Sequence, residues 1–343
     1  MTRPTATGRA WNLVKRLFIG ALLILLALLP YLSSTYVVYL AIHIMILSLF
    51  ALGFNLLFGY TGLLSFGQAG FYAVGAYVCA KILLARPSLL LGVIGGTLAA
   101  SLASIVVGAL SVRHTRIYFS MLTLAFGMII FSLAWKWRDL TGGDDGLVGI
   151  PRAPLVLGPL TLNMASLDRY YFFVLIVVAL ATWFMYRVVA SPFGLTLQAI
   201  RDSETRAPFT GVPVRGHRFV AFVIAGTYAG LAGSLLPPLE NTVTPPVAHW
   251  TTSAEPVLAT LLGGIHTFVG PIVGAFLLFL IKDLIVRVTI HWSIVLGITV
   301  IVLVMGFRGG VAGALAGLFQ RVLAARSSTI PAPMPAGTEG DEP

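Results

Sequence analysis

The chain has 343 residues, of which 58% are hydrophobic and only 10% are charged. Soluble domains carry about 25% charged residues, so this composition excludes a water-soluble globular protein and makes lipid the solvent for most of the surface. The net charge is +10, but the basic residues are scattered singly between apolar runs. That distribution favours topology determinants and contact with membrane lipid over binding of nucleic acid.

Long, continuous apolar runs predict an all-α integral membrane protein, a polytopic bundle of about ten transmembrane helices, one or two of them short or broken. The expected spans are 17–33, 36–58, 66–85, 89–111, 117–137, 170–189, 218–237, 254–268, 270–289 and 292–307. The eighth is short and ends at Gly263, which makes it a candidate half-span or re-entrant element. The third opens with Gly67 and Gly70 and is a candidate broken helix.

The distribution of Lys and Arg between the loops predicts that both termini are cytoplasmic. On this topology residues 1–16 form a cytoplasmic N-terminal segment, 17–308 the transmembrane domain, and 309–343 a cytoplasmic tail that is disordered at its end. Residues 138–169 form an outer loop, and 190–217 form a long cytoplasmic loop. Glycine and serine recur at helix-packing spacing within the spans, as in the pairs Gly226 with Gly230, Gly270 with Gly274, and Ser104 with Gly108.

The cytoplasmic loop contains a predicted short amphipathic helix that begins after Pro192. Its apolar residues share one face: Phe193, Leu197 and Ile200. Such a helix either lies on the bilayer surface or fills a groove on a partner protein with its apolar face. Asp202 and Glu204 would be repelled by anionic lipid, which favours the partner.

Polar residues inside spans are candidates for a solute path. Ser65, Gln68 and Tyr72 are spaced to face one way on a helix, although interhelical hydrogen bonding explains them equally well. His43 and Asn55 in the second span are interpreted as interhelical hydrogen-bonding groups.

Several kinds of chemistry are not indicated by the sequence. No lysine follows a glycine, so the phosphate-cradling loop G-x-x-x-x-G-K-[ST] is absent and the chain is not expected to hydrolyse ATP. The acidic residues are interpreted as lying away from the middle of the spans, which argues against a proton relay. No histidine cluster has metal-ligand spacing, and Cys79 is the single cysteine, so neither a metal site nor an intramolecular disulfide is predicted.

Five blocks of sequence resemble one known family. They are GFNLLFGYTGLLSFGQAGFYAVGAYV at 53–78, TGGDDGLVGIP at 141–151, GLTLQAIRDSETRAPFTGV at 194–212, FVAFVIAGTYAGLAGSL at 219–235 and LATLLGGIHTFVGPIVGAFL at 258–277. In content and order they are similar to the permeases of branched-chain amino-acid ABC importers, of the LivM type. The blocks and the intervals between them cover most of the predicted transmembrane domain.

The resemblance implies a transmembrane permease subunit of an ATP-driven importer in the bacterial inner membrane. The implied substrates are branched-chain amino acids or related small solutes, moved by alternating access. The implied partners are a second permease subunit (a LivH-like homologue or a second copy), two ABC ATPase subunits and an extracytoplasmic substrate-binding protein. The chain itself has no expected cofactor, because ATP is used by the ATPase partner. An ion-coupled secondary carrier and a passive channel are the alternatives.

The resemblance also assigns roles to residues. Those expected to face the ATPase are Gly194, Ala199, Ile200, Arg201, Asp202, Glu204, Ala207 and Gly211. Pro208 stands where relatives usually carry a small helix-forming residue, so the docking helix is expected to end early, near Arg206. In the outer loop, Asp144 and Asp145 are expected to contact the binding protein, or else to belong to a solvated turn.

Overall fold

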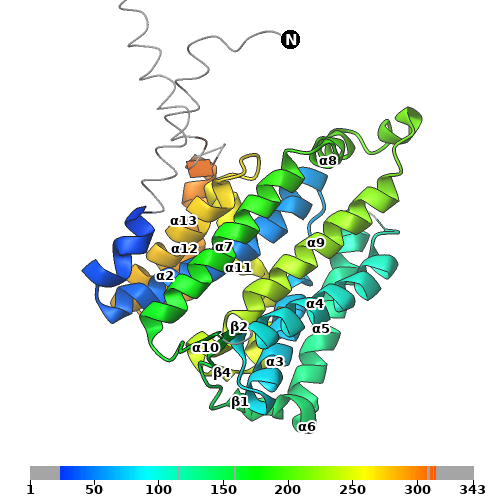
Figure 1. Cartoon of the computed structure of the whole chain (residues 1–343). Helices are drawn as coiled ribbons and strands as arrows, with labels where there is room; N and C mark the ends of the chain where they lie inside the picture. The colour runs from blue at the N-terminus through cyan, green and yellow to red at the C-terminus, as the bar shows by residue number, and fades with distance from the viewer. Residues whose placement is uncertain (1–23, 115, 158–159, 307–309, 312, 314–343) are drawn as a thin grey trace, which may run out of the picture.

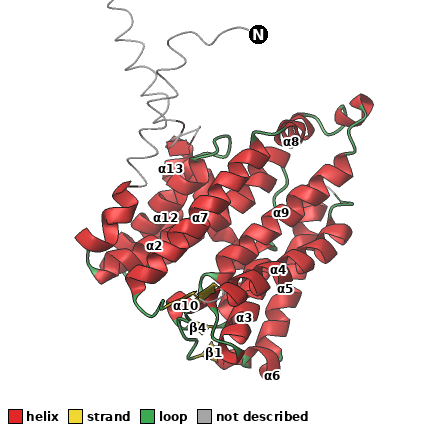
Figure 2. Ribbon diagram, viewed as in Figure 1, coloured by secondary structure: helices red, strands yellow, loops and turns green. Residues whose placement is uncertain are grey.

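The computed structural model describes residues 24–114, 116–157, 160–306, 310, 311 and 313. Most of this part is helical, and the long helices lie alongside one another (Figure 2). Helix α8 lies at one end of the molecule, and α6, α10 and β1 lie at the opposite end (Figure 1). We call these the α8 end and the α10 end. The predicted segment 1–16 lies outside the described residues, as does almost all of the predicted tail 309–343.

After a helical stretch at 24–32, the elements follow in chain order. The α-helices are α2 (Thr35–Asn55), α3 (Gln68–Ala85), α4 (Leu89–Ser111), α5 (Arg116–Lys136), α6 (Arg138–Thr141), α7 (Leu167–Val189), α8 (Pro192–Asp202), α9 (Val214–Ser234), α10 (Pro237–Glu240), α11 (Trp250–Gly263), α12 (Gly270–Val288) and α13 (Trp292–Gly306). A π-helix, η1 (Leu56–Thr61), continues α2, and 3-10 helices lie at η2 (Gly143–Asp145), η3 (Ala207–Thr210) and η4 (Pro245–Ala248).

Six helical stretches of the described chain are long and apolar enough to cross a membrane: Thr35–Thr61, Gln68–Ala85, Leu89–Ser111, Ile117–Lys136, Leu167–Val189 and Val214–Glu240. This confirms a multi-pass helical bundle, whereas the predicted total of about ten spans stays a prediction. The eighth predicted span, 254–268, is α11, which has 14 residues and is as short as expected. It begins earlier than predicted, at Trp250, and ends at Gly263, where the glycine pair Gly263 and Gly264 indicated.

One order of elements occurs twice along the chain. A helical stretch of 27 residues, Thr35–Thr61 or Val214–Glu240, is followed by a segment without α-helix and then by three helices. The packing also repeats, because α3 packs against α4 and α9 while α11 packs against α12 and α2. α2 leads into η1, which contacts α8, whereas α9 begins near α8 and leads away from it to α10 (Figure 1). The two repeats are therefore inverted relative to each other, an arrangement common in transporters.

Each repeat contains an interrupted helix. The first interrupted segment, residues 62–67, follows the π-helix η1 and begins with Gly62 at φ +74°. The second interrupted segment, residues 241–249, follows α10 and begins with Asn241 at φ +57°. Glycine and asparagine adopt this left-handed conformation most readily, so the residue types fit the turns. The predicted break at the start of span 66–85 thus precedes α3, which is itself continuous.

Four short strands depart from the all-α prediction. β1 (Leu147–Val148) pairs antiparallel with β4 (Thr242–Val243), and Leu147 is opposite Val243. β2 (Leu155–Leu157) pairs antiparallel with β3 (Leu160–Leu162). Strands of two or three residues are too short to produce a readable alternation of apolar and polar residues. The first pair joins the predicted outer loop to the second interrupted segment.

Small residues allow the helices to approach closely, as their spacing predicted. A Cβ atom at Gly226 would meet the side chain of Ser104, and one at Gly230 would meet that of Ala100, so both glycines pack α9 against α4. Gly274 plays the same part between α12 and α11.

Gly233 in α9 provides a test of this packing. A Cβ atom there would overlap the backbone carbonyl of Tyr72 in α3, so we expect Gly233→Ala to destabilise the protein by about 1–3 kcal/mol. Gly216 lies in the same helix with open space around it, and Gly216→Ala is expected to be neutral or to stabilise by up to about 1 kcal/mol. Thermal unfolding midpoints in detergent measure both. Equal midpoints for the two variants would contradict the close approach.

Candidate functional site

Helix α8 lies beyond the long helices at one end of the molecule (Figure 1). Pro192 is its first residue, where the fixed φ of proline favours helix initiation. Leu197 and Ile200 are fully buried, and α8 packs against η1, α7 and α9. The apolar face therefore attaches α8 to its own chain, which differs from the expectation that this face fills a partner's groove. On the other side, Leu195 is 64% exposed.

Helix α8 ends earlier than expected, and a turn follows it. α8 ends at Asp202 rather than near Arg206, and Ser203 has an extended conformation. The chain then turns into the 3-10 helix η3, whose second residue is Pro208. Gly211 closes η3 with φ +79°. The rest of the predicted docking segment is thus a turn and not a longer helix.

Arg201 points from α8 toward the first repeat. Its Nη1 donates to the carbonyl oxygen of Gly59 in η1 at 2.6 Å and lies 3.2 Å from Nδ1 of His266. Its Nε and Nη2 donate to Oδ1 of Asp202 at 3.2 and 3.1 Å. The side chain also packs on Gly62, where a Cβ atom would approach Arg201 Cγ to 3.1 Å. His266, which follows α11, is exposed on its other sides.

Glu204 is directed toward α9. Its Oε1 accepts a hydrogen bond from Nη1 of Arg218 at 2.6 Å. Arg218 is only 4% exposed, so this ion pair joins the turn after α8 to the first turns of α9. A single arginine at the start of an apolar span gave no signal of this role in the sequence.

The eight residues expected to face an ATPase all lie at the α8 end but differ in accessibility. Gly194, Ile200 and Ala207 are buried, Arg201 and Glu204 are partly buried, and Ala199, Asp202 and Gly211 are exposed. The exposed members, together with Leu195, define a surface available to a partner. The role of each residue toward such a partner stays a prediction.

The three predicted path residues surround the start of α3. Ser65 lies in the first interrupted segment, Gln68 is the first residue of α3, and Tyr72 follows one turn later. Ser65 and Gln68 are 0% exposed and Tyr72 is 7% exposed. Because Ser65 is not helical, the three do not share a helix face as the spacing suggested. Among the described residues, Ser65 Oγ and both amide atoms of Gln68 have no hydrogen-bond partner.

The start of α3 also meets the start of α11. The backbone N–H of Ala69 donates to Oγ of Ser253 at 2.8 Å, and Ser253 is the fourth residue of α11. The helices that follow the two interrupted segments therefore touch near their N-termini. Ser253 was not recognised in the sequence, because only the tertiary fold brings it to α3.

The outer loop places its acidic pair at the surface. Asp144 and Asp145 lie in η2, and both are exposed. Within the part of the chain that the structure describes, neither carboxylate forms an ion pair. The flanking glycines Gly142, Gly143 and Gly146 all have positive φ, which explains the glycine-rich TGGDDG sequence as a turn that only glycine adopts easily.

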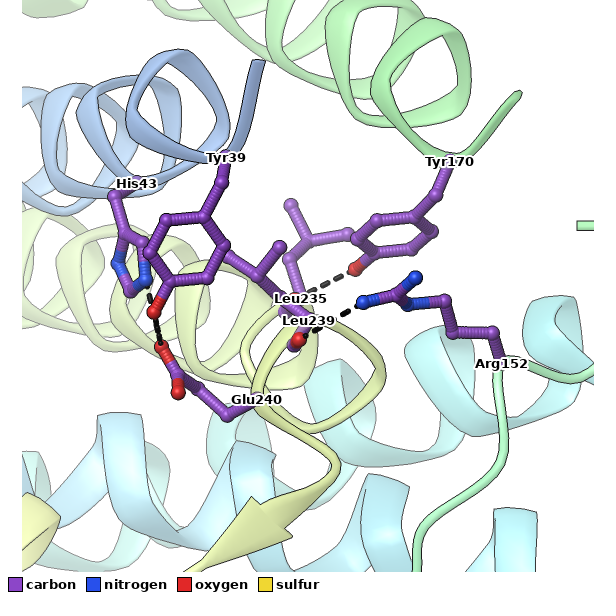
Figure 3. A network of polar contacts seen from close by, with 7 residues as sticks. All are labelled: Tyr39, His43, Arg152, Tyr170, Leu235, Leu239 and Glu240. Carbon is purple, nitrogen blue, oxygen red and sulfur yellow. Dashed lines mark hydrogen bonds and ion pairs between the residues drawn. The ribbon is translucent and has the colours of Figure 1, made fainter. Parts of the chain in front are cut away.

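Helix α10 and the turn just before it are held by side chains from three other elements (Figure 3). Nε of Arg152, from the outer loop, donates to the carbonyl of Pro238 at 2.9 Å, and Nη2 donates to that of Leu239 at 3.3 Å. The hydroxyl of Tyr170, in α7, donates to the carbonyl of Leu235 at 2.6 Å. From α2, the hydroxyl of Tyr39 donates to Glu240 Oε1 at 2.7 Å, and His43 Nε2 lies 2.6 Å from the same oxygen.

One acidic residue within a helix corrects a conclusion from the sequence. Glu255 lies in the second turn of α11, although no carboxylate was expected in the middle of a span. Asp283 lies nearer the end of α12, beside Tyr36 in the first turn of α2, and agrees with that expectation. Each has a basic partner, as Lys282 Nζ is 2.9 Å from Glu255 and Arg287 Nη2 is 2.8 Å from Asp283. The error for Glu255 arose because an expected helix start at 254 put this residue at the helix end. The interhelical role predicted for His43 is confirmed by its contact with Glu240.

Long apolar helices in two inverted repeats, with one tethered helix outside them, define a multi-pass helical membrane protein. The family model described as "Branched-chain amino acid transport system / permease component" matches residues 36–305. The chain therefore belongs to this family of transport permeases.

Individual relatives agree with the family. The chain is 29% identical over 295 residues to the high-affinity branched-chain amino acid transport system permease protein LivM of Escherichia coli K12, a match that covers 79% of this chain and 68% of the relative. The Salmonella typhimurium protein of the same description is 28% identical with the same coverage. A probable branched-chain amino acid transport permease protein LivH of Methanocaldococcus jannaschii is 25% identical over 70% of this chain and 77% of the relative. No solved structure matches the chain.

Proposed function

We propose that the chain is the permease subunit of an ATP-driven ABC importer for branched-chain amino acids or related small solutes. It moves substrate by alternating access while a separate ATPase supplies the energy. In this proposal the protein is in the bacterial inner membrane, the α8 end is cytoplasmic together with both termini, and the α10 end faces the outside.

The observation that carries this proposal is the tethering of α8. Buried Leu197 and Ile200 fix the helix to three neighbouring elements, while Leu195 stays 64% exposed and Phe209 in η3 is 90% exposed. A helix held rigidly on one side and apolar on its free side suits a partner that pushes on it. The free side of α8 is therefore assigned to the ATPase.

The remaining partners follow from the relatives and from the outer surface. The relatives include proteins named LivM and LivH, which supports pairing with a second permease, either a LivH-like homologue or a second copy. Asp144 and Asp145 are exposed beside β1 and are assigned to the substrate-binding protein, where charge pairing would speed encounter. The chain needs no cofactor of its own, since the ATPase partner uses the ATP.

The substrate path is assigned to the polar residues around the start of α3: Ser65, Gln68 and Tyr72. Ser65 and Gln68 are supported by their buried polar atoms, which have no partner among the described residues and are costly unless a ligand or water meets them. Tyr72 is included because it lies one turn further along α3. The position next to an interrupted segment also fits, since broken helices commonly line transport sites.

The variant Gln68→Leu tests whether Gln68 serves the substrate path or only the packing of α3. Removal of an unpaired buried amide is expected to leave stability unchanged or raised, whereas a path role predicts a loss of uptake of about tenfold or more. The hydroxyl of Tyr77, also in α3, is likewise buried without a partner in the described part of the chain, so Tyr77→Phe is the matched control and is expected to transport normally. Uptake of radiolabelled leucine into proteoliposomes measures both. Normal uptake by Gln68→Leu would remove Gln68 from the path.

The proposed function itself is tested by reconstitution with the products of neighbouring genes. We expect leucine accumulation only when three components are present together: the ATPase, the binding protein, and ATP on the side of the membrane that the ATPase faces. Omission of the ATPase should abolish accumulation. Accumulation by the permease without the ATPase would overturn the proposal.

An ion-coupled carrier is the second candidate, and two pairs of partly buried ionisable groups between helices favour it. His43 with Glu240 and Lys282 with Glu255 are the kind of pairs that proton relays use. This candidate predicts uptake driven by an imposed proton gradient without ATP, which the same proteoliposomes measure.

A further inference from the structure

Two arginines outside the long helices make corresponding contacts at opposite ends of the molecule. Arg201 belongs to α8, and its guanidinium donates to the carbonyl of Gly59 at 2.6 Å. Arg152 belongs to the outer loop, and its guanidinium donates to the carbonyls of Pro238 and Leu239 at 2.9 and 3.3 Å. Each arginine therefore bonds to the backbone, and to no side chain, of the helix that it reaches.

The two accepting helices occupy equivalent places in the inverted repeats. Gly59 lies in η1 at the end of the first 27-residue stretch, three residues before Gly62. Pro238 lies in α10 at the end of the second such stretch, three residues before Asn241. Gly62 and Asn241 have positive φ and begin the two interrupted segments. Both arginines thus bind the last helical turn before a break.

The chemistry suits a contact that holds the end of a helix in place. The last carbonyls of a helix have no partner within it, and they carry partial negative charge. An arginine that donates to them stabilises that end. In η1 the wider π-helical turn already departs from regular α-helical bonding, as happens often at functional sites. Loss of either guanidinium would therefore release the adjoining interrupted segment before it affects the rest of the bundle.

Each arginine also belongs to a segment assigned to an external partner. Arg201 is one residue before exposed Asp202 on the helix assigned to the ATPase. Arg152 follows the TGGDDGLVGIP block, which contains the acidic pair assigned to the binding protein. Other contacts connect the outer loop with the second interrupted segment, since β1 pairs with β4 and Ile150 N–H donates to the carbonyl of Asn241 at 3.0 Å.

We propose that Arg201 and Arg152 are matched latches: Arg201 couples α8 to the first interrupted segment, and Arg152 couples the outer loop to the second. The inference rests on the proposed function for the identity of the two partners, but not for the contacts themselves. Both are positioning residues, because they act on transport through the backbone that they hold. The first segment lines a surface hollow with α5, where the hydroxyl of Ser120 donates to the carbonyl of Leu64 at 2.6 Å, so its release opens that hollow.

Cysteine accessibility tests the latches in the complete assembly. The chain has one cysteine, Cys79, which is buried, so the background labelling is low. Phe66→Cys reports on the first segment and Val247→Cys on the second. Without nucleotide, we expect Arg201→Gln to raise the maleimide labelling rate at position 66 about tenfold and to leave position 247 unchanged. Arg152→Gln is expected to do the reverse.

Two matched variants control for loss of positive charge. Arg206 is exposed beside α8 and donates to the hydroxyl of Ser203. Arg169 is exposed at the start of α7 and donates to the carbonyl of Asn163. Arg206→Gln and Arg169→Gln are expected to label at wild-type rates. Arg201→Lys and Arg152→Lys retain a donor and are expected to label at intermediate rates.

The crossed pattern distinguishes latches from ordinary structural damage. A general loss of stability would raise labelling at both positions in either variant, and that result would overturn the proposal. Labelling equal to that of the Arg206→Gln and Arg169→Gln controls would also overturn it. ATP-dependent leucine uptake is measured on the same preparations. If uptake by the wild-type protein does not depend on ATP, the proposed function is wrong. The labelling rates measured without nucleotide still show whether the two arginines hold the interrupted segments.

Discussion

Glu204→Lys is expected to destabilise the protein by about 2–3 kcal/mol, which lowers the thermal unfolding midpoint in detergent. Removal of one partner of a buried ion pair leaves an uncompensated charge, which costs about 3–5 kcal/mol when both groups are buried. Arg218 is buried, but Glu204 is partly exposed, so solvent screening reduces the effect. The new lysine adds repulsion to the lost attraction.

Asp202→Lys is the matched control, because the same charge reversal two residues earlier meets a different environment. The Asp202 side chain is 66% exposed, and its only ion pair in the described chain is with the adjacent Arg201. The expected change in stability is within about 0.5 kcal/mol. The double variant Glu204→Lys with Arg218→Glu restores the pair and is expected to regain most of the midpoint. A double variant no more stable than Glu204→Lys would show that the ion pair is not the cause.

This contrast shows what the sequence could not provide. Asp202 and Glu204 are close neighbours in one polar loop, and the family resemblance implied the same role for both. Only the tertiary fold places Glu204 next to Arg218, 14 residues later in the sequence, and leaves Asp202 in solvent. Pairing partners distant in sequence leave no local pattern, because an ion pair depends on tertiary distance alone.

Features governed by local physics were predictable. Long apolar runs gave the helices, and Gly263 ended the short eighth span because glycine accepts the unusual backbone that follows, where Gly264 has φ +113°. The interruption before α3 was expected from its glycines but placed a few residues too late. The inverted repeats were not foreseen, since the two halves share the order and packing of their helices, which only the tertiary fold shows.

The polar site was predictable only in part. Gln68 and Tyr72 were found because polar groups are rare in apolar spans, and both lie buried beside the break. Ser253 and Arg152 were missed, although one touches α3 and the other holds α10. Each is a single residue whose partner is a backbone group, and a backbone group has no signature in the sequence.

Leu195→Asp is expected to reduce co-purification of the ATPase about tenfold or more. Burial of an exposed leucine in an interface contributes about 1.5–3 kcal/mol, and an aspartate there also loses hydration, while each 1.4 kcal/mol changes affinity tenfold. Leu195 is 64% exposed on the free side of α8, opposite the buried Leu197 and Ile200. The substitution therefore changes the proposed docking surface without disturbing the packing that holds α8.

Val148→Asp is the matched control at the opposite end. Val148 is 69% exposed in β1, so the same kind of apolar-to-acidic change there is expected to leave the ATPase bound at the wild-type ratio. Quantitative immunoblotting of the purified assembly measures both variants. ATPase retention by Leu195→Asp at the wild-type ratio would contradict docking on this face. If the same variant also labelled less with a photoreactive lipid, α8 would instead lie on the bilayer surface, because an aspartate is repelled by anionic headgroups.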